Sequence, residues 1–189
     1  YAKEFGYVIK LLGVAKNTED GIEVKVHPML IPNNHPLANV NDAFNAVFVH
    51  GKAMDDAMFM GRGAGQMPTA SAVVGDIIDV CRNIVHDSCG RIGCCCYKNL
   101  EVKDITDTKS KFFLRLEVAD KQGVLANIAS VLGNSGVSIA QVVQKSGKDG
   151  VAELVIITAE VLEKNFNDAM AVFKGLSAVK NIAGVIRVY

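Results

Sequence analysis

Apolar and polar residues alternate with two different periods over the last part of the chain, from about residue 111 to residue 189. Every second side chain from Phe112 to Val118 is apolar, which is typical of a strand with one buried face. From Val124 to Asn134 the apolar residues recur at helical spacing instead. Further strands are expected at 137–144, 151–159 and 182–188, and a second helix at 163–176. The resulting order, βαββαβ, predicts a ferredoxin-like α+β domain.

The first part of the chain has the pattern of antiparallel strands followed by one helix. Tyr7 to Ala15 is an apolar run rich in branched residues and Gly21 to Leu30 alternates, so the two runs predict a hairpin. A second pair of strands is expected at 43–49 and 57–60. Pro68 begins a helix that runs to about Val85. Its apolar residues are spaced for one buried face: Val73, Val74, Ile77, Ile78 and Cys81.

These patterns divide the chain into three parts and assign two faces. Residues 1–86 predict part of a mixed or antiparallel sheet with a helix at its end, residues 87–110 a linker, and residues 111–189 the ferredoxin-like domain. The strand 21–30 is expected to be half buried, with these residues on opposite faces: Ile22, Val24 and Val26 against Glu23, Lys25 and His27. The helix 124–134 is expected to place four residues on one side: Leu125, Ile128, Ala129 and Leu132.

The charge balance and the length of the apolar runs exclude several classes of protein. Twenty basic side chains offset twenty acidic ones, whereas a nucleic-acid-binding domain normally carries a basic excess. No apolar run is long enough to span a bilayer. The first residues lack the apolar core and the cleavage site of a signal peptide. The chain opens at Tyr1 without an initiator Met, in what reads as the middle of a structural element, so we expect a fragment.

Five cysteines lie in the middle of the chain: Cys81, Cys89, Cys94, Cys95 and Cys96. An odd number with three adjacent is a poor disulfide framework, so a reducing cytoplasm is the simplest setting. Free thiols in a connector are one interpretation. A zinc site near His86, or a redox sensor, is the alternative, although the spacing within Cys89–Cys96 does not match a C-x-x-C knuckle. We therefore assign no metal site.

The turn between the first strand and the first helix of the last domain is suited to a small anionic group. Gly123 lets the turn approach a ligand closely, and the N–H groups of Val124, Leu125 and Ala126 lie at a helix N-terminus, which suits an amino acid's carboxylate. The segment from Ala119 to Leu125 resembles the signature of ACT domains, and so does Asn134 to Ile139 one helix later.

That resemblance implies a small amino-acid effector, bound by the turn and by the start of the second strand of the same or a partner chain. The expected effector residues are Asp120, Gly123, Val124, Leu125, Ala126, Asn127, Ser138, Ile139 and Gln141. A purely structural, dimer-forming ACT domain is the alternative.

The first part of the chain carries a more specific resemblance, which depends on five segments in register. They are Val26 to Pro32, His35 to Ala38, Asn45 to Val47, Met58 to Gly65 and Pro68 to Ile78. In this order and spacing they resemble the C-terminal half of the catalytic region of homoserine dehydrogenase. The resemblance implies an NAD(P)-dependent oxidoreductase that interconverts aspartate semialdehyde and homoserine in threonine and methionine biosynthesis. It also implies a substrate and dimerisation domain at 1–86 and feedback regulation by threonine through the ACT domain.

The resemblance places the cofactor beside the loop Gly63, Ala64 and Gly65. An ordinary strand-to-helix turn is the alternative, since the spacing does not match G-x-G-x-x-G. No catalytic residue is assigned, because none of Lys3, Lys10 and Lys16 matches the motif of the family's catalytic lysine. We therefore expect NAD or NADP in the full-length enzyme, no cofactor bound to this chain, and no dehydrogenase activity from this chain alone.

Three functional hypotheses remain open at this point. The chain is part of a homoserine dehydrogenase, a stand-alone amino-acid-sensing or dimerisation protein without catalysis, or a zinc or redox module around Cys89–Cys96. In the first two, we expect a homodimer or a higher homo-oligomer, formed through the strands between Ile22 and Val49, through the ACT sheets, or through both.

Overall fold

The structure is a computed structural model that describes residues 1–90, 93–94, 98–146 and 149–189. The chain forms two compact units. The first contains Tyr1–Asn33 and Leu100–Tyr189, and the second contains Asn34–Asn99. The α+β architecture expected from the sequence is confirmed in the described residues.

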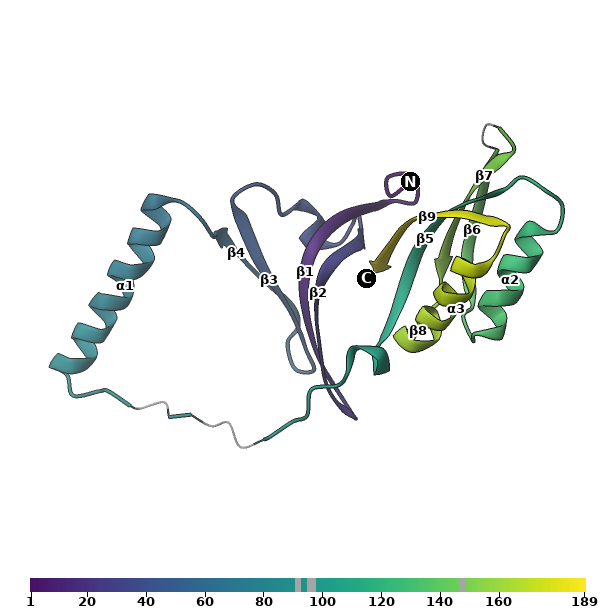
Figure 1. The fold of residues 1–189 in the computed structure, drawn as a ribbon. Coiled ribbons are helices and arrows are strands. Elements are labelled where there is room, and N and C mark those ends of the chain that lie inside the picture. Colours follow the sequence, from purple (N-terminus) through teal and green to yellow (C-terminus); the bar gives the residue numbers. More distant parts are fainter. Residues whose placement is uncertain (91–92, 95–97, 147–148) are drawn as a thin grey trace. The chain divides into compact units, whose positions relative to one another are not determined.

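A mixed sheet forms the first unit (Figure 1). Its strands are β1 (Tyr7–Thr18), β2 (Gly21–Pro32), β5 (Lys109–Ala119), β6 (Ile139–Ser146), β7 (Val151–Thr158), β8 (Val161–Leu162) and β9 (Val179–Val188). The main path has the order β1-β2-β9-β5-β7-β6, with β8 paired to β5 alone. All pairs are antiparallel except β2 and β9, which run parallel. The edge strands are therefore β1 and β6.

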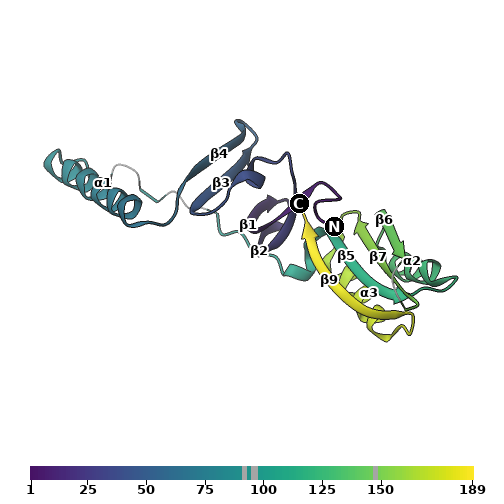
Figure 2. The ribbon, with the colours of Figure 1, turned by 90° about the horizontal axis from the view of Figure 1, so that it is seen from above.

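Two helices cover one face of this sheet. They are α2 (Val124–Asn134) and α3 (Glu163–Gly175), and Figure 2 shows them beneath the adjacent strands β9, β5, β7 and β6. Together these elements give the predicted order βαββαβ, with the two-residue β8 added before α3.

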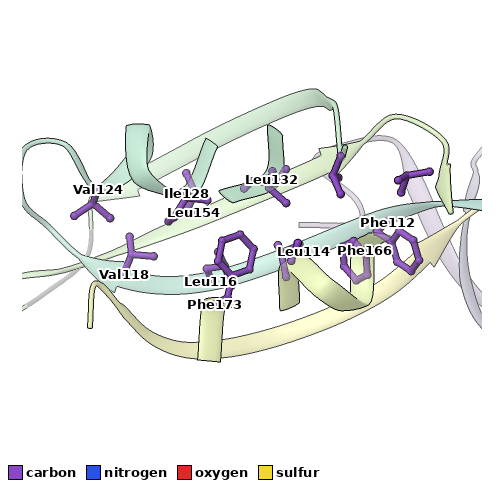
Figure 3. Close-up of a cluster of buried hydrophobic side chains, with 14 of the residues drawn as sticks. Phe112, Leu114, Leu116, Val118, Val124, Ile128, Leu132, Leu154, Phe166 and Phe173 are labelled. Carbon is purple, nitrogen blue, oxygen red and sulfur yellow. The ribbon is translucent and has the colours of Figure 1, made fainter. Parts of the chain in front are cut away.

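The core between the sheet and the helices follows the period-two pattern of β5. Phe112, Leu114, Leu116 and Val118 all lie in it, as predicted, together with Ile128 and Leu132 of α2 and Phe166 and Phe173 of α3 (Figure 3). The rings of Phe112 and Phe166 stack with centroids 3.7 Å apart. The predicted face of α2 was wrong at one position. Leu125 is 40% exposed, because the first turn of the helix buries Val124 instead.

The hairpin β1–β2 was predicted correctly, but it buries the opposite face from the one its hydrophobicity indicates. Val24 and Val26 are exposed, while Glu23 and Lys25 are each only 8% exposed. Directly opposite residues of an antiparallel pair share a face, so Val14 opposite Lys25 lies on the inner side. The reason is that the inner face lies against the polar start of β5, where Nζ of Lys25 donates to the carbonyl of Lys109 and to Oγ of Ser110. Glu23 in turn pairs with Lys25 and Lys103.

The stretch predicted as a linker takes part in the first unit from Leu100 onward. The amide of Ile22 donates to the carbonyl of Glu101, and the amide of Lys103 donates to the carbonyl of Ile22, both at 2.9 Å. A short 3-10 helix, η2 (Ile105–Asp107), then leads into β5. The turn of the hairpin is thereby tied to the segment that enters the ACT domain.

The second unit contains η1 (Pro36–Asn39), the hairpin of β3 (Phe44–Gly51) and β4 (Asp55–Arg62), and α1 (Gln66–Val85). The predicted buried face of α1 was wrong. All five of its residues are exposed: Val73, Val74, Ile77, Ile78 and Cys81. A helical period specifies an apolar stripe but not a partner, and the described elements of this unit leave the stripe uncovered.

Candidate functional site

The turn that leads into α2 has the backbone geometry that the sequence predicted. Gly123 has φ of 84°, a left-handed conformation that favours glycine. The amide of Asp120 donates to the carbonyl of Gly150 at 2.8 Å, and the amide of Asn127 donates to the carbonyl of Gly123 at 3.0 Å. Asp120, Gly123, Leu125, Ala126 and Asn127 are exposed, whereas Val124 is buried. The amide of Val124, the first of the helix, donates to the carbonyl of Lys121 at 3.4 Å.

The other predicted effector residues lie at the far end of the sheet. Ser138 accepts from the amide of Ala159, and Ile139 pairs with Thr158 at the start of β6. Asp120, by contrast, is bonded to Gly150 at the start of β7. The chain from Gly150 to Ala159, which includes the whole of β7, spans about 30 Å at 3.3 Å per residue. One chain therefore brings together Asp120–Asn127, and separately Ser138, Ile139 and Gln141, but not the two groups with each other.

The predicted cofactor loop connects β4 to α1 in the second unit. The amide of Gly63 donates to the carbonyl of Ala43 at 3.0 Å, and a Cβ on Gly63 would lie 1.8 Å from Nδ2 of Asn45. Gly65 has φ of 127° and is the N-cap of α1. Gly63, Ala64 and Gly65 are exposed. The local packing explains both glycines as a strand-to-helix turn, and contact with a cofactor stays a prediction.

A buried ionic network that the sequence analysis missed connects the hairpin to the ACT domain. Glu163, which is 2% exposed, accepts from Nε and Nη2 of Arg187 at 2.6 Å each and from Oγ of Ser110 at 2.8 Å. Nζ of Lys25 donates to Oγ of Ser110 at 3.0 Å and to the carbonyl of Lys109 at 2.9 Å. The one sequence signal for this network was the polar face of strand 21–30.

Burial and pairing act in opposite directions on the titration of this network. Burial raises the pKa of Glu163, but the hydrogen bonds from Arg187 and Ser110 outweigh it and hold that pKa below its usual value. Burial lowers the pKa of Lys25, and the charge of Glu23 offsets this only in part. Burial also lowers the pKa of His27, with the positive charge of Arg187 acting in the same direction.

A cavity of about 290 Å³ lies beside the network within the first unit. Its charged lining residues are Lys16, Glu23, Lys25, Lys109, Lys111 and Glu160. They come from both strands of the hairpin, from the start of β5 and from the turn after β7. None of the predicted effector residues lines it.

The cysteine cluster lies only partly in the described residues. Cys81, Cys89 and Cys94 are exposed, and Cys95 and Cys96 lie outside the described residues. Among the residues that the structure describes, no three His, Cys, Asp or Glu side chains are close enough to hold a metal ion. None of the described helices is long and apolar enough to cross a membrane.

The split βαββαβ arrangement, with a left-handed glycine at the start of its first helix, defines a ferredoxin-like α+β domain, the fold that ACT domains share. Residues 106–187 match the ACT domain model, and residues 1–78 match the homoserine dehydrogenase model. The two matches confirm both resemblances, of residues 1–78 to homoserine dehydrogenases and of residues 106–187 to ACT domains.

Individual relatives agree with this assignment. The homoserine dehydrogenase of Pseudomonas aeruginosa is 39% identical over the whole chain, and that of Corynebacterium glutamicum is 40% identical over 98% of it. The chain spans 45% and 42% of the length of these two proteins.

Solved structures give the same result. A homoserine dehydrogenase structure from Thiobacillus denitrificans superposes on the whole chain with a TM-score of 0.90 at 39% identity, and the chain covers 44% of it. The Staphylococcus aureus enzyme at pH 6.0 has a TM-score of 0.61 at 27% identity, over the whole chain and 43% of its own length.

Proposed function

We propose that the chain is the C-terminal part of a homoserine dehydrogenase. The complete enzyme would interconvert aspartate semialdehyde and homoserine with NAD or NADP in the cytoplasm. The family match over residues 1–78 supports this proposal. The loop Gly63, Ala64 and Gly65 would approach the cofactor in that enzyme. The chain alone would have no dehydrogenase activity, since none of Lys3, Lys10 and Lys16 matches the motif of the family's catalytic lysine. We also expect no cofactor bound to the chain alone.

The ACT domain would act as the sensor of a small amino acid, most directly threonine as the feedback product. The turn Asp120–Asn127 would hold the effector's carboxylate at the exposed start of α2. The observation that carries this proposal is the position of the remaining effector residues. Ile139 and Gln141 lie on β6, and Ser138 lies directly before it. β6 is an edge strand of the sheet and thus available for pairing with a second copy.

If two copies pair through β6 about a two-fold axis at the middle of the strand, their sheets join into one. The turn Asp120–Asn127 of one copy and the start of β6 of the other then lie at the same end of the joined sheet. Antiparallel pairing of β6 with its copy puts the start of the partner's strand beside the end of the first chain's strand. The first chain's β6 ends where β7 begins, and Asp120 is bonded to Gly150 at that end. The effector site would then combine Asp120–Asn127 of one chain with Ser138, Ile139 and Gln141 of its copy.

A thermal-shift screen tests the sensor. The melting temperature of the chain should rise with threonine and less, or not at all, with methionine, isoleucine, lysine and serine, because a ligand that binds only the folded state stabilises it by mass action. Flat melting curves for all of them would leave the second candidate, an ACT domain that only forms dimers, which the free β6 edge also supports.

A mixing experiment tests whether the site is shared between two chains. Asp120→Ala and Ser138→Ala homodimers should each lose the response to the effector. After unfolding and refolding together, half of the dimers are mixed, and each mixed dimer regains one intact site, so about a quarter of the sites should recover. A mixture as unresponsive as either parent would show that each site lies within one chain.

A further inference from the structure

The cavity beside the buried network carries an excess of positive charge that the ACT effector site does not explain. Four lysines and two glutamates line it. One of the two carboxylates, Glu23, is already shared between cations, since its oxygens lie 3.7 Å from Nζ of Lys25 and 3.6 Å from Nζ of Lys103. The exposed side chain of Glu160 and the terminal carboxylate of Tyr189 are the other acidic groups of the lining, and they face three further lysines.

Three of the lysines are available to a ligand. In the part of the chain that the structure describes, the ammonium groups of Lys16, Lys109 and Lys111 make no ion pair or hydrogen bond. They reach the cavity from β1 and from the first residues of β5. Lysines from two different strands of the sheet, β1 and β5, therefore line the same cavity.

Lys25 contributes a largely buried positive charge to the lining of the cavity. It is 8% exposed, and its Nζ is held by the carbonyl of Lys109 and Oγ of Ser110. Burial makes its charged form costly, so its pKa is lowered. A negative ligand nearby would offset that cost, because charges interact more strongly where water is excluded.

We propose that this cavity binds a small dianion, a phosphate group or a dicarboxylate, between Lys16 and Lys25 of the hairpin and Lys109 and Lys111 of β5. The volume of about 290 Å³ suits a ligand smaller than most cofactors. An anion offsets the surplus positive charge of the lining residues, whereas a neutral zwitterion would leave it unbalanced. The site is distinct from the effector turn and does not depend on the proposed function.

The test uses the full chain with inorganic phosphate and with succinate, at constant ionic strength made up with sodium chloride. Isothermal titration should show one site per chain for at least one of the two dianions. The Lys16→Gln/Lys111→Gln variant should bind about tenfold more weakly or worse, because two exposed cations near the ligand are removed. The matched control is Lys164→Gln/Lys174→Gln, which removes two exposed lysines of α3 outside the cavity and should bind like the unmodified chain.

The outcomes separate the ligand sources and the alternatives. Binding of phosphate alone would indicate phosphoryl compounds, binding of succinate alone would indicate dicarboxylates, and binding of both would indicate a general dianion site. No binding of either at millimolar concentration would overturn the proposal, and so would equal affinities for the cavity variant and the control. Because threonine is absent from these titrations, a failure here leaves the sensor proposal untouched.

Discussion

Glu163 shows how one residue fixes the start of a helix in the core. It lies at the first position of α3, where a negative charge is favoured by the helix dipole. Its two oxygens accept both bonds of the Arg187 fork from β9, and Ser110 of β5 supplies a third. A carboxylate that is 2% exposed is tolerated only with such partners. The residue therefore ties α3 to two strands at once.

Replacing Glu163 with Gln should destabilise the chain by about 2–4 kcal/mol at pH 7, because the charge of Arg187 is then left without its counter-charge. Urea unfolding measures the change. The matched control is Glu160→Gln, an exposed carboxylate that should change stability by less than about 0.5 kcal/mol. Similar losses for both variants would contradict a special role for the buried pair.

The same residue predicts how stability depends on pH. The pKa of Glu163 is lowered in the folded state, so its contribution is complete above the carboxyl's unfolded pKa of about 4.3 and is lost as the pH falls further. Unfolding free energies measured at pH 7 and at about pH 3.5 should converge between Glu163→Gln and the unmodified chain. A constant difference across that range would show that Glu163 does not titrate as part of the pair.

Single residues also mark the limit of what the sequence predicts. The turn at Gly123 was predictable because a left-handed glycine before an apolar helix is a local signal. Lys25, Ser110, Glu163 and Arg187 were not, because they meet through pairings far apart in the chain. Nothing in their local surroundings distinguishes them from solvated polar residues.

At the scale of elements, hydrophobic periodicity predicted the type and order of the helices and strands well. It predicted less well which of their faces are buried. The bounds of α2 agree at both ends, and each expected strand exists. The apolar face of α1 is exposed, and β2 buries its polar face instead of its apolar face. A hydrophobic period defines two faces of an element, but only the packing partner decides which of them is covered. The partner of β2 is the polar start of β5, which covers the polar face.

The turn of the hairpin β1–β2 should be sensitive to a single methyl group. Gly21 has φ of 135°, and a Cβ there would lie 2.7 Å from the carbonyl oxygen of Glu101. Gly21→Ala should therefore cost about 2–4 kcal/mol, through backbone strain and loss of the contact to residues 101–103. Chemical denaturation measures this cost.

Gly13→Ala is the matched control in the same hairpin. Its Cβ would meet only Cγ2 of Val26 at 3.8 Å, and alanine loses less chain entropy than glycine in a strand, so stability should stay equal or rise by up to about 1 kcal/mol. If both variants lose stability equally, the hairpin turn is not held by residues 101–103.

At the scale of the whole molecule, the first unit leaves two surfaces open to a second copy. One is the outer face of the hairpin, where Leu11 is 73% exposed and Val26 is 72% exposed. The other is the edge of β6, where Val142 is 42% exposed. At the opposite edge of the ACT strands, β2 pairs with the last residues of β9, Met29 with Arg187 and Leu30 with Val188. In the described residues β6 has a strand partner on one side only, so we expect a second copy to pair there.

We predict that the chain is a dimer at micromolar concentration and that the β6 edge holds it together. Val142→Lys should produce monomers in light scattering and abolish the shift in melting temperature with threonine. A lysine near the two-fold axis would face its own copy, and like charges across paired strands repel. Val172→Lys, an equally exposed valine on α3, should remain dimeric and responsive. If Leu11→Lys/Val26→Lys produces monomers instead, the copies meet through the hairpin, and an effector site shared across β6 is untenable.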